Sequence, residues 1–262
     1  MRKYLTIVIG IIFLIIFGGC QTLPKPNFAP EGKSLKFVTY NVNMQGHAPR
    51  VTEFLQKIDA DIICLQETHG QWESFLREHL TGQYPHMSFH NTAGGGGISI
   101  LSKHPQSEQQ VIRSEAGWFP ALYAKVSTPI GEIGVLIVHL KPPVSDKGSV
   151  TAYAILKSPE THLGEMKEFF DKLESKAPLI VAGDFNEDES GKACQWLIGR
   201  GYIESLSLFD RKSHTWIWRT KPGIVLKNRY DHIFVNQQFQ CTGAGVFQVK
   251  ASDHEPVLSV LQ

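Results

Sequence analysis

The chain has 262 residues, of which 42% are hydrophobic and 10% aromatic, so a packed core is expected and a disordered chain is excluded. Its formal net charge of +1 at pH 7 excludes the strong basic field that holds nucleic acid non-specifically, although a local basic patch is compatible with it. The length allows one large domain or two small ones.

The first predicted element is an export leader. Arg2 and Lys3 precede a continuous apolar run over 5–17, and two glycines then lead into Cys20. A membrane-spanning helix needs about 20 apolar residues, so this shorter run is typical of a secretory signal. The Gly-Gly-Cys sequence resembles a bacterial lipobox, whose cysteine is lipidated, although Phe17 stands where that pattern usually has Leu. We therefore expect residues 1–19 to be a lipoprotein signal peptide and Cys20 to be the lipidated residue, with an uncleaved anchor or a plain secretory signal as alternatives.

A tether is predicted over residues 20–34, because prolines and a glycine over 24–32 interrupt any regular element. The expected location is the cell envelope, with the exported protein held at a membrane by its lipid anchor. By resemblance to other lipoproteins, Gln21 after the cysteine favours the outer membrane where the organism has one. Removal of the leader also removes Arg2 and Lys3, which leaves the mature chain close to neutral.

Strand-like and helix-like stretches alternate from residue 35 to the end, and no linker or internal repeat is visible, so we predict one mixed α/β domain over 35–262. The predicted helices cover 51–58, 71–80, 161–173 and 193–199, and the predicted strands include 98–102, a hairpin of 122–127 and 133–139, 215–219, 229–236 and 257–261. The segment between 219 and 229 is expected to be a turn and a loop, and no exposed apolar hairpin that would enter lipid is evident. The glycine run 94–97 precedes a strand rather than a helix, which favours a flexible turn over a phosphate-binding loop.

Three further cysteines give no zinc-binding spacing. Cys64 lies in an apolar run and is expected to be a buried thiol. Cys194 and Cys241 could form a disulfide in an oxidising compartment, and the sequence leaves this pairing open.

Several apolar runs have a polar residue at one end. A buried strand over 179–183 delivers Asp184 and Asn186, and strand alternation is expected to turn both to the same side. Other runs end at or begin with an amide, a carboxylate or an imidazole. We expect the strand ends to converge on one site that contains Asn41, Glu67, His139, Asp184, Asn186, Asp231, Asp253 and His254.

The order and spacing of six short motifs resemble those of the endonuclease/exonuclease/phosphatase superfamily. The motifs are Thr-Tyr-Asn to Asn41, Leu-Gln-Glu-Thr around Glu67, Val-His-Leu around His139, Gly-Asp-Phe-Asn over 183–186, Tyr-Asp-His-Ile-Phe-Val over 230–235 and Ser-Asp-His over 252–254. The resemblance covers about 35–262. It implies an α/β fold of the deoxyribonuclease I type, a four-layer α/β/β/α sandwich, and hydrolysis of phosphoesters.

Carboxylate and amide oxygens are ligands that suit Mg²⁺, and a divalent cation offsets the charge that protects a phosphate from attack. Asn41, Glu67 and Asp253 are the candidate metal ligands, with Mn²⁺ as a possible substitute for Mg²⁺; the number of metal ions is left open. The candidate catalytic residues are His139, Asp184, Asn186, Asp231 and His254. Water is the expected nucleophile, and the base is either Asp184 or His254 oriented by Asp231.

The favoured function is a metal-dependent phosphodiester hydrolase that acts as a nuclease, with a monomeric chain. One alternative is a phospholipid or sphingomyelin phosphodiesterase or a phosphatase of the same superfamily, which membrane anchoring would suit. Another is a non-catalytic binding lipoprotein, although none of the expected polar positions carries an apolar residue. Trp216 and Trp218 could stack on bases or pack in the core, and Trp118 and Lys141 could contact substrate.

Overall fold

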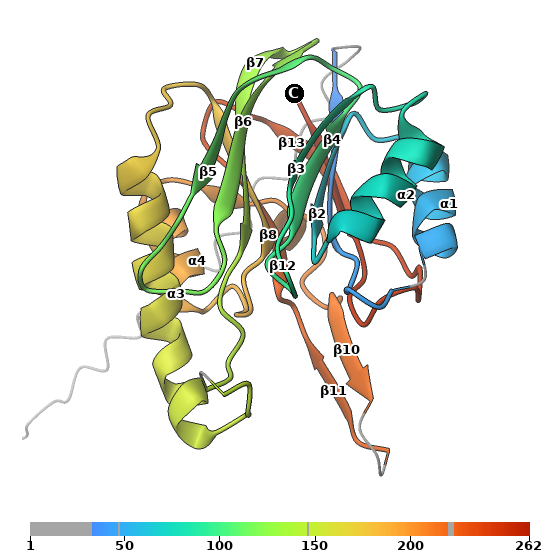
Figure 1. Ribbon diagram of the computed structural model, residues 1–262. Coiled ribbons are helices and arrows are strands. Elements are labelled where there is room, and N and C mark those ends of the chain that lie inside the picture. The colour runs from blue at the N-terminus through green and yellow to red at the C-terminus, as the bar shows by residue number, and fades with distance from the viewer. Residues whose placement is uncertain (1–32, 47, 146, 220–222) are drawn as a thin grey trace, which may run out of the picture.

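The computed structural model describes residues 33–46, 48–145, 147–219 and 223–262. The predicted leader, the lipidation residue Cys20 and most of the tether lie outside these residues. Two six-stranded sheets face each other and helices cover their outer faces (Figure 1), which confirms the predicted four-layer α/β/β/α sandwich. No helix within the described ranges is long and apolar enough to cross a bilayer.

The first sheet has the strand order β13-β14-β1-β2-β4-β3. Its strands are β13 (Cys241–Val246), β14 (Val257–Leu261), β1 (Leu35–Asn41), β2 (Ile62–Gln66), β4 (Ile98–Ser102) and β3 (His86–His90). Helices α1 (Ala48–Ile58) and α2 (Gly70–Leu80) pack on its outer face through Leu55, Trp72 and Leu76.

The second sheet has the order β5-β6-β7-β8-β12-β9. Its strands are β5 (Gln106–Ile112), β6 (Ala121–Thr128), β7 (Gly131–His139), β8 (Leu179–Asp184), β12 (Asp231–Val235) and β9 (Ile203–Glu204). Helices α3 (Ala152–Lys172) and α4 (Lys192–Gly199) cover it, and a short 3-10 helix, η1, spans Leu206–Leu208. Between the sheets, Phe37, Ile100 and Ile137 belong to a central apolar core that fixes one sheet on the other.

Strand register brings the predicted site residues to one end of the sandwich. β1 is parallel to β2 and β7 is parallel to β8, so the carboxyl ends of these strands lie together. In the second sheet Asp184 pairs with His139 on one side and with Asp231, which begins the antiparallel β12, on the other. β1 contacts both β8 and β12 across the sandwich. The central core therefore positions groups from both sheets against each other.

A third, two-stranded sheet is a hairpin of β10 (Trp216–Arg219) and β11 (Val225–Asn228), which extends beyond the sandwich (Figure 1). The prediction of a loop at β11 is therefore wrong, as is the expectation that no exposed apolar hairpin exists. Trp218, Val225 and Leu226 are all exposed on it. Pairing with β10 orders this segment, and a short run with so few buried residues has no periodic signal in sequence.

Helix α3 begins well before the predicted start at residue 161. Thr151 caps it by accepting a hydrogen bond from the backbone N–H of Ala154 at 3.1 Å, and Pro159 lies inside it. Proline normally signals a helix end, which explains the late prediction. The Cys194–Cys241 pairing is not formed, because both side chains are free, buried thiols, as is Cys64.

Candidate active site

Asp184 lies at the centre of the converging strand ends and is almost fully buried. Its Oδ2 accepts a hydrogen bond from Asn41 Nδ2 at 3.0 Å, across the gap between the two sheets. The same oxygen lies 3.6 Å from Nε2 of His139 and 3.6 Å from Nε2 of His254. Four of the predicted site residues therefore meet around one carboxylate oxygen.

The residue before Asp184 has to be glycine. Gly183 has φ +142°, and a Cβ there would lie 1.9 Å from the carbonyl oxygen of Val138 on the neighbouring strand. Any larger residue would push β8 away from β7, because that oxygen belongs to the backbone. Gly183 thus permits the close strand pairing that sets Asp184 beside His139.

Asn41 links the carboxylates of Asp184 and Glu67, at the side of the site where the candidate metal ligands lie. Its Nδ2 also donates to Glu67 Oε1 at 3.0 Å, and Glu67 Oε2 accepts from the backbone N–H of Met44 at 3.2 Å. Asp253 lies nearby, where its two oxygens accept from Asn43 Nδ2 at 2.8 Å and from Trp216 Nε1 at 3.2 Å. All three predicted metal ligands are therefore part of one hydrogen-bonded edge of the site.

Positive φ values concentrate at this site. Asn43, Glu67 and Asn186 have φ of 52°, 61° and 50°, in the left-handed region that side chains other than glycine seldom adopt. Such backbone persists where surrounding contacts enforce it, and it is common at functional sites. Glu67 directly follows β2, and Asn43 and Asn186 lie two residues past the ends of β1 and β8, where the chain turns sharply.

The expectation that strand alternation turns Asp184 and Asn186 the same way is wrong, because β8 ends at Asp184. A turn follows, in which the backbone N–H of Asn186 donates to Asp184 Oδ1 at 2.9 Å. The Asn186 amide then donates through Nδ2 to the carbonyl of Leu140 at 2.9 Å, directly after His139. Asn186 therefore ties the two loops that carry Asp184 and His139.

His254 and Asp231 form a buried pair, with 2.8 Å between His254 Nδ1 and Asp231 Oδ2. Burial raises the pKa of the Asp231 carboxyl. Burial also opposes protonation of His254, but the carboxylates of Asp231 and Asp184 outweigh it and raise the pKa of the imidazole to about 10. These two neighbours therefore favour the charged imidazolium form of the ring. Arg229 is not the partner of Asp231, since its guanidinium donates to the backbone carbonyls of Ser213 and Asp210.

The glycine run forms a turn, as expected, but the turn is built into the site. His139 Nδ1 lies 2.9 Å from the carbonyl oxygen of Gly95, so Nδ1 carries a proton and Nε2 faces Asp184. A Cβ on Gly97 would lie 1.3 Å from the carbonyl oxygen of Thr68, immediately after Glu67. Phe119 packs on the other side of this turn and stacks near the His139 ring at 4.6 Å.

A buried network under the site was not predicted. His162 on α3 contacts Glu187 Oε2 through Nδ1 at 2.9 Å and the Lys141 carbonyl through Nε2 at 2.8 Å. Glu165, one turn further along α3, accepts from the Lys141 backbone N–H at 3.1 Å. These side chains hold the segments that follow His139 and Asn186. No local motif marks them, since a histidine and a glutamate in an amphipathic helix look like ordinary surface residues.

The pKa of Glu165 gives a prediction about stability. Burial raises the pKa of this carboxyl from 4.5 to about 7, although the Lys141 N–H and the His162 ring favour its ionised form. The folded chain therefore holds this proton up to a higher pH than the unfolded chain, and the free energy of unfolding falls as pH rises from about 4.5 to about 7. Since one pKa unit corresponds to about 1.4 kcal/mol, Glu165→Gln should remove roughly 3 kcal/mol of this dependence.

Urea unfolding of both proteins at pH 4.5 and pH 8 measures this difference. Glu168→Gln is the matched control on the same helix, because the backbone N–H of Glu115 lowers the pKa of Glu168. Glu168→Gln should not reduce the fall in the free energy of unfolding between pH 4.5 and pH 8. An equal slope in the wild type and Glu165→Gln would contradict the assignment.

The donor set fits a hard divalent cation. Asp231 Oδ1 is buried and has no hydrogen-bond partner, which is costly for a carboxylate oxygen unless something else satisfies it. Carboxylate oxygens of Asp184 and Asp231 lie within 4.8 Å of each other, beside the His254 ring. Glu67 and Asp253 add further carboxylates at the same end of the sheets. Oxygen-rich sites of this kind suit Mg²⁺ or Mn²⁺ rather than a thiolate-binding metal.

Comparisons with known proteins agree with this geometry. The model described as "Endonuclease/Exonuclease/phosphatase family" matches residues 38–254. The chain is 23% identical over 160 residues to exodeoxyribonuclease III of Haemophilus influenzae, a match that covers 58% of this chain and spans only 57% of that relative.

Solved structures share the fold. D. rerio TDP2 in complex with a single-strand DNA product has a TM-score of 0.70 at 16% identity, covering 88% of this chain and 100% of that chain. An AP endonuclease from Archaeoglobus fulgidus has a TM-score of 0.66 at 17% identity, covering 86% of this chain and 98% of that chain.

Proposed function

The chain belongs to the endonuclease/exonuclease/phosphatase family, and from this premise we propose that it is a divalent-metal-dependent phosphodiesterase that cleaves nucleic acid. The observation that carries the proposal is the meeting of Asn41, His139 and His254 around Asp184 Oδ2. Groups from both sheets surround one buried carboxylate, and such an arrangement suits activation of water beside a phosphate.

Glu67, Asn41 and Asp253 would hold Mg²⁺, with Mn²⁺ as a substitute. When bound, the cation acts as a Lewis acid on the phosphate and offsets its negative charge. Glu67 is the direct ligand, because Asn41 and the Met44 N–H orient both of its carboxylate oxygens. Asp253 is oriented in the same way by Asn43 and Trp216.

Asp184 is the general base that takes the proton of the attacking water. His254 already carries a proton at neutral pH, because the pKa of its ring is raised to about 10, so it suits the role of a cation beside the phosphate. Asp231 positions that ring through the 2.8 Å contact at Nδ1. Of the two candidate bases that the sequence left open, the proposal therefore chooses Asp184.

His139 and Asn186 contact the phosphate from the other side of Asp184. The Gly95 carbonyl fixes the orientation of the His139 ring. Asn186 uses one N–H on Leu140, and its second N–H can donate to a non-bridging oxygen that gains charge in the transition state.

Two features favour nucleic acid as the substrate. The relatives and fold neighbours include enzymes named for action on DNA, exodeoxyribonuclease III and AP endonuclease. Trp118 is 40% exposed and lies beside Phe119, and Lys141 Nζ sits 4.4 Å from its ring centre. An exposed indole with an ammonium group next to the His139 loop can stack on a base and contact a phosphate.

Hydrolysis of bis-p-nitrophenyl phosphate and nicking of plasmid DNA test the proposal. Both reactions should require Mg²⁺ or Mn²⁺ and stop with EDTA. Absence of metal-dependent turnover on either substrate would overturn the enzymatic proposal and favour a binding lipoprotein. Cleavage of sphingomyelin or phospholipid with no nicking of DNA would favour the second candidate, a lipid phosphodiesterase, which the exposed apolar β10–β11 hairpin supports.

We also propose that residues 1–19 are a lipoprotein signal, that Cys20 carries the lipid and that residues 20–34 tether a monomeric catalytic domain, 35–262, to the cell envelope. Cys20→Ala should then move the protein from the membrane pellet to the soluble fraction, because the acyl chains are lost. Immunoblots of fractionated cells measure this, with Thr22→Ala as the neighbouring control. A mutant that stays in the pellet like the control would count against lipidation.

A further inference from the structure

The first turns of α3 expose an unusual number of large apolar side chains. Tyr153 and Leu156 are 71% and 78% exposed, and Val150 and Ile155 are also more than half exposed. Further along, the same helix buries Met166 and Phe169 against the second sheet. We call residues 150–157 the helix tip. Contiguous exposed apolar surface of this kind marks a binding surface for a protein or a membrane.

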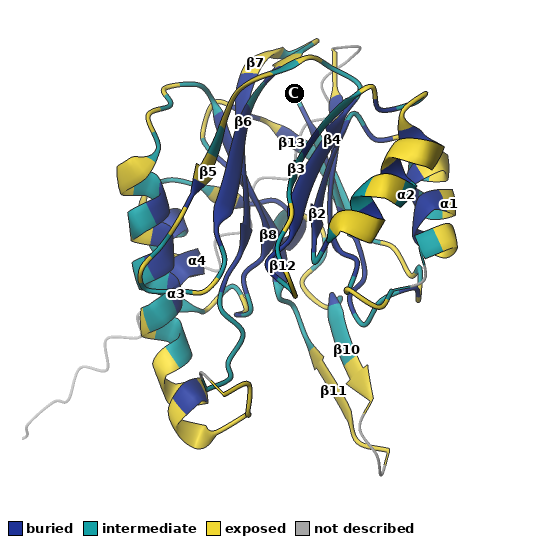
Figure 2. Ribbon diagram, viewed as in Figure 1, coloured by how far each residue is buried: buried dark blue, intermediate teal, exposed yellow. Residues whose placement is uncertain are grey.

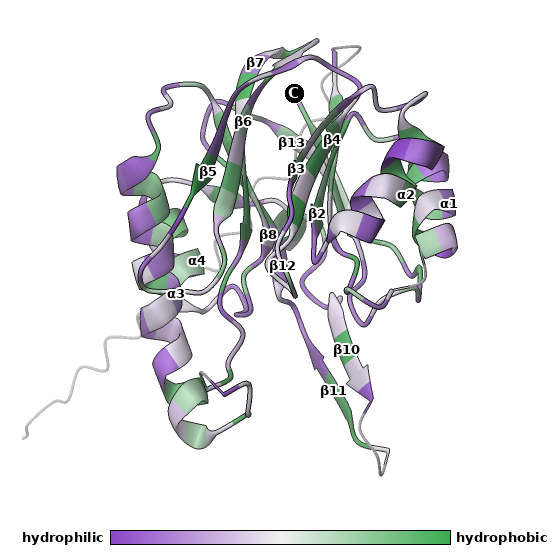
Figure 3. Ribbon diagram, viewed as in Figure 1, coloured by the Kyte–Doolittle hydropathy of each residue, from purple (hydrophilic) through white to green (hydrophobic). Residues whose placement is uncertain are grey.

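A second apolar surface lies on the β10–β11 hairpin. Ile224 is 59% exposed, Trp218 is 46% exposed, and Val225 and Leu226 also face solvent. We call these residues with Arg219 the hairpin tip. Figure 1 shows that both tips project from the end of the sandwich at which β7 runs into the loop before α3, which is the end that holds the active site. Apolar and exposed colouring coincide at both tips (Figures 2 and 3).

Both tips have positive charge. Lys157 belongs to the helix tip, Arg219 belongs to the hairpin tip, and Lys227 lies on β11. No aspartate or glutamate occurs among the described residues 148–158, 216–219 and 223–228. Apolar side chains flanked by lysine and arginine suit an anionic lipid surface, where each cation adds about 1 kcal/mol of attraction. A tryptophan at such a surface can sit at the level of the head groups.

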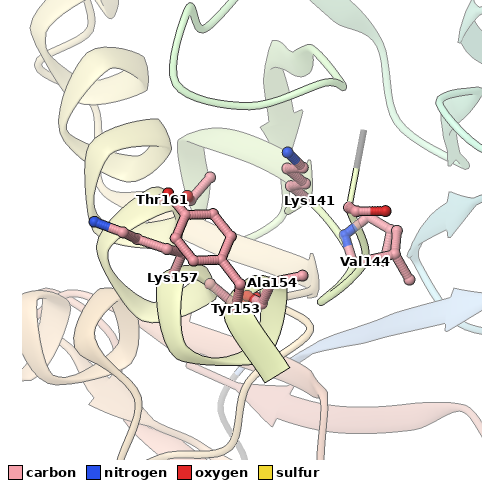
Figure 4. A pocket seen from close by; sticks show the side chains of 9 residues that line it. Lys141, Val144, Tyr153, Ala154, Lys157 and Thr161 are labelled. Atoms are coloured by element: carbon pink, nitrogen blue, oxygen red, sulfur yellow. The ribbon is translucent and has the colours of Figure 1, made fainter. Parts of the chain in front are cut away.

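The pocket beside the helix tip does not look like a site for a small anion. It has a volume of about 140 Å³ and lies between the 141–145 loop and α3. In Figure 4 the ammonium groups of Lys141 and Lys157 point away from each other, and the Tyr153 ring lies between them. The aromatic and apolar groups, rather than a phosphate cradle, therefore dominate this end of α3.

The geometry points to a lipid bilayer as the partner of both tips, so that the end of the molecule with the active site faces the membrane. β1 begins at the opposite end of the sandwich (Figure 1), so a lipid on Cys20 can share this membrane only if the segment before Leu35 is long enough to span the domain. Residues 21–34 can extend over roughly 45–50 Å at about 3.3–3.6 Å each, which exceeds the roughly 30 Å length of the longest strand. This proposal rests on the proposed function in one respect, the lipid anchor on Cys20 that holds the catalytic domain at the membrane.

The test uses the full chain in vesicles of phosphatidylethanolamine and phosphatidylglycerol. Single cysteines at Leu156→Cys and Leu226→Cys carry the fluorophore NBD. The proposed lipid occupies the sulfur of Cys20, and the native thiols Cys64, Cys194 and Cys241 are buried. Glu78→Cys, exposed on α2, is the control position. Emission should rise about threefold at both tips and be quenched by nitroxide on the lipid tails, with no change at the control. Equal emission at all three positions would overturn the proposal.

A second variant separates docking from catalysis. Leu156→Glu with Leu226→Glu, in a chain labelled at Tyr153→Cys, should abolish the rise in emission and leave hydrolysis of bis-p-nitrophenyl phosphate unchanged. Retained insertion of this variant would contradict the docking surface. A rise in emission without vesicles that grows with protein concentration would instead identify a second copy of the chain as the partner. Loss of hydrolysis in every protein, with insertion intact, would refute the phosphodiesterase proposal alone.

Discussion

Glu67→Gln should lower kcat/KM for bis-p-nitrophenyl phosphate by about a thousandfold, since loss of a direct metal ligand removes several kcal/mol of transition-state stabilisation. The glutamine keeps the size of the side chain, and its one carbonyl oxygen can still accept the hydrogen bond from Asn41, so the fold should be retained although the bond from the Met44 N–H is lost. The Mg²⁺ concentration that gives half-maximal rate should rise strongly, because a neutral amide oxygen binds the cation more weakly than a carboxylate.

A metal titration of the rate, together with circular dichroism, measures this effect. Glu78→Gln, an exposed carboxylate on α2, is the matched control and should behave like the wild type. Wild-type turnover by Glu67→Gln at ordinary Mg²⁺ concentration would refute the role of Glu67 as a metal ligand.

Asp184→Asn should lower kcat by about a thousandfold with little change in KM, because general base catalysis contributes about 10²–10⁴ to the rate. The substitution removes the negative charge that lies 3.6 Å from both His139 Nε2 and His254 Nε2. Asp188→Asn, an exposed carboxylate in the turn that follows, is the control and should retain full activity.

The pH profile of the wild type distinguishes Asp184 from His254 as the base. The raised pKa of His254, about 10, means that a base role for this ring would make the rate climb tenfold per pH unit between pH 7 and pH 9. Without a base role for His254, this climb should be absent. A steep climb that His254→Ala abolishes would reverse the assignment.

Most of the residues that the structure brings together at the strand ends have a signal in the sequence, because they end or begin an apolar run. Asn41, His139 and Asp184 are the last residues of strands, and Glu67 directly follows one. These strands are buried toward their carboxyl ends, so an apolar run gives way to a polar residue there. The topology that joins these ends depends on contacts between the sheets, and the resemblance to a known family supplied it.

The supporting residues could not be predicted, because their roles depend on contacts that are distant in sequence. Asn43 reaches Asp253 across 210 positions, and the carbonyl of Gly95 reaches His139 across 44 positions. The turn at Asn186 depends on a left-handed φ, and the rule that side chains alternate along a strand does not predict such a turn. The helix tip was missed for a different reason, since its apolar side chains face solvent and do not follow the pattern of a core helix.

The two sheets each contribute one half of the site, and Asn41 spans the gap by donating to Glu67 from its own sheet and to Asp184 from the other. Misplacement of reacting groups by about 1 Å can cost a hundredfold in rate. The turnover rate therefore responds more sensitively to the relative position of the two sheets than any probe of secondary structure does. If one sheet slid against the other in the central core, the proposed activity would be lost while every strand kept its hydrogen bonds.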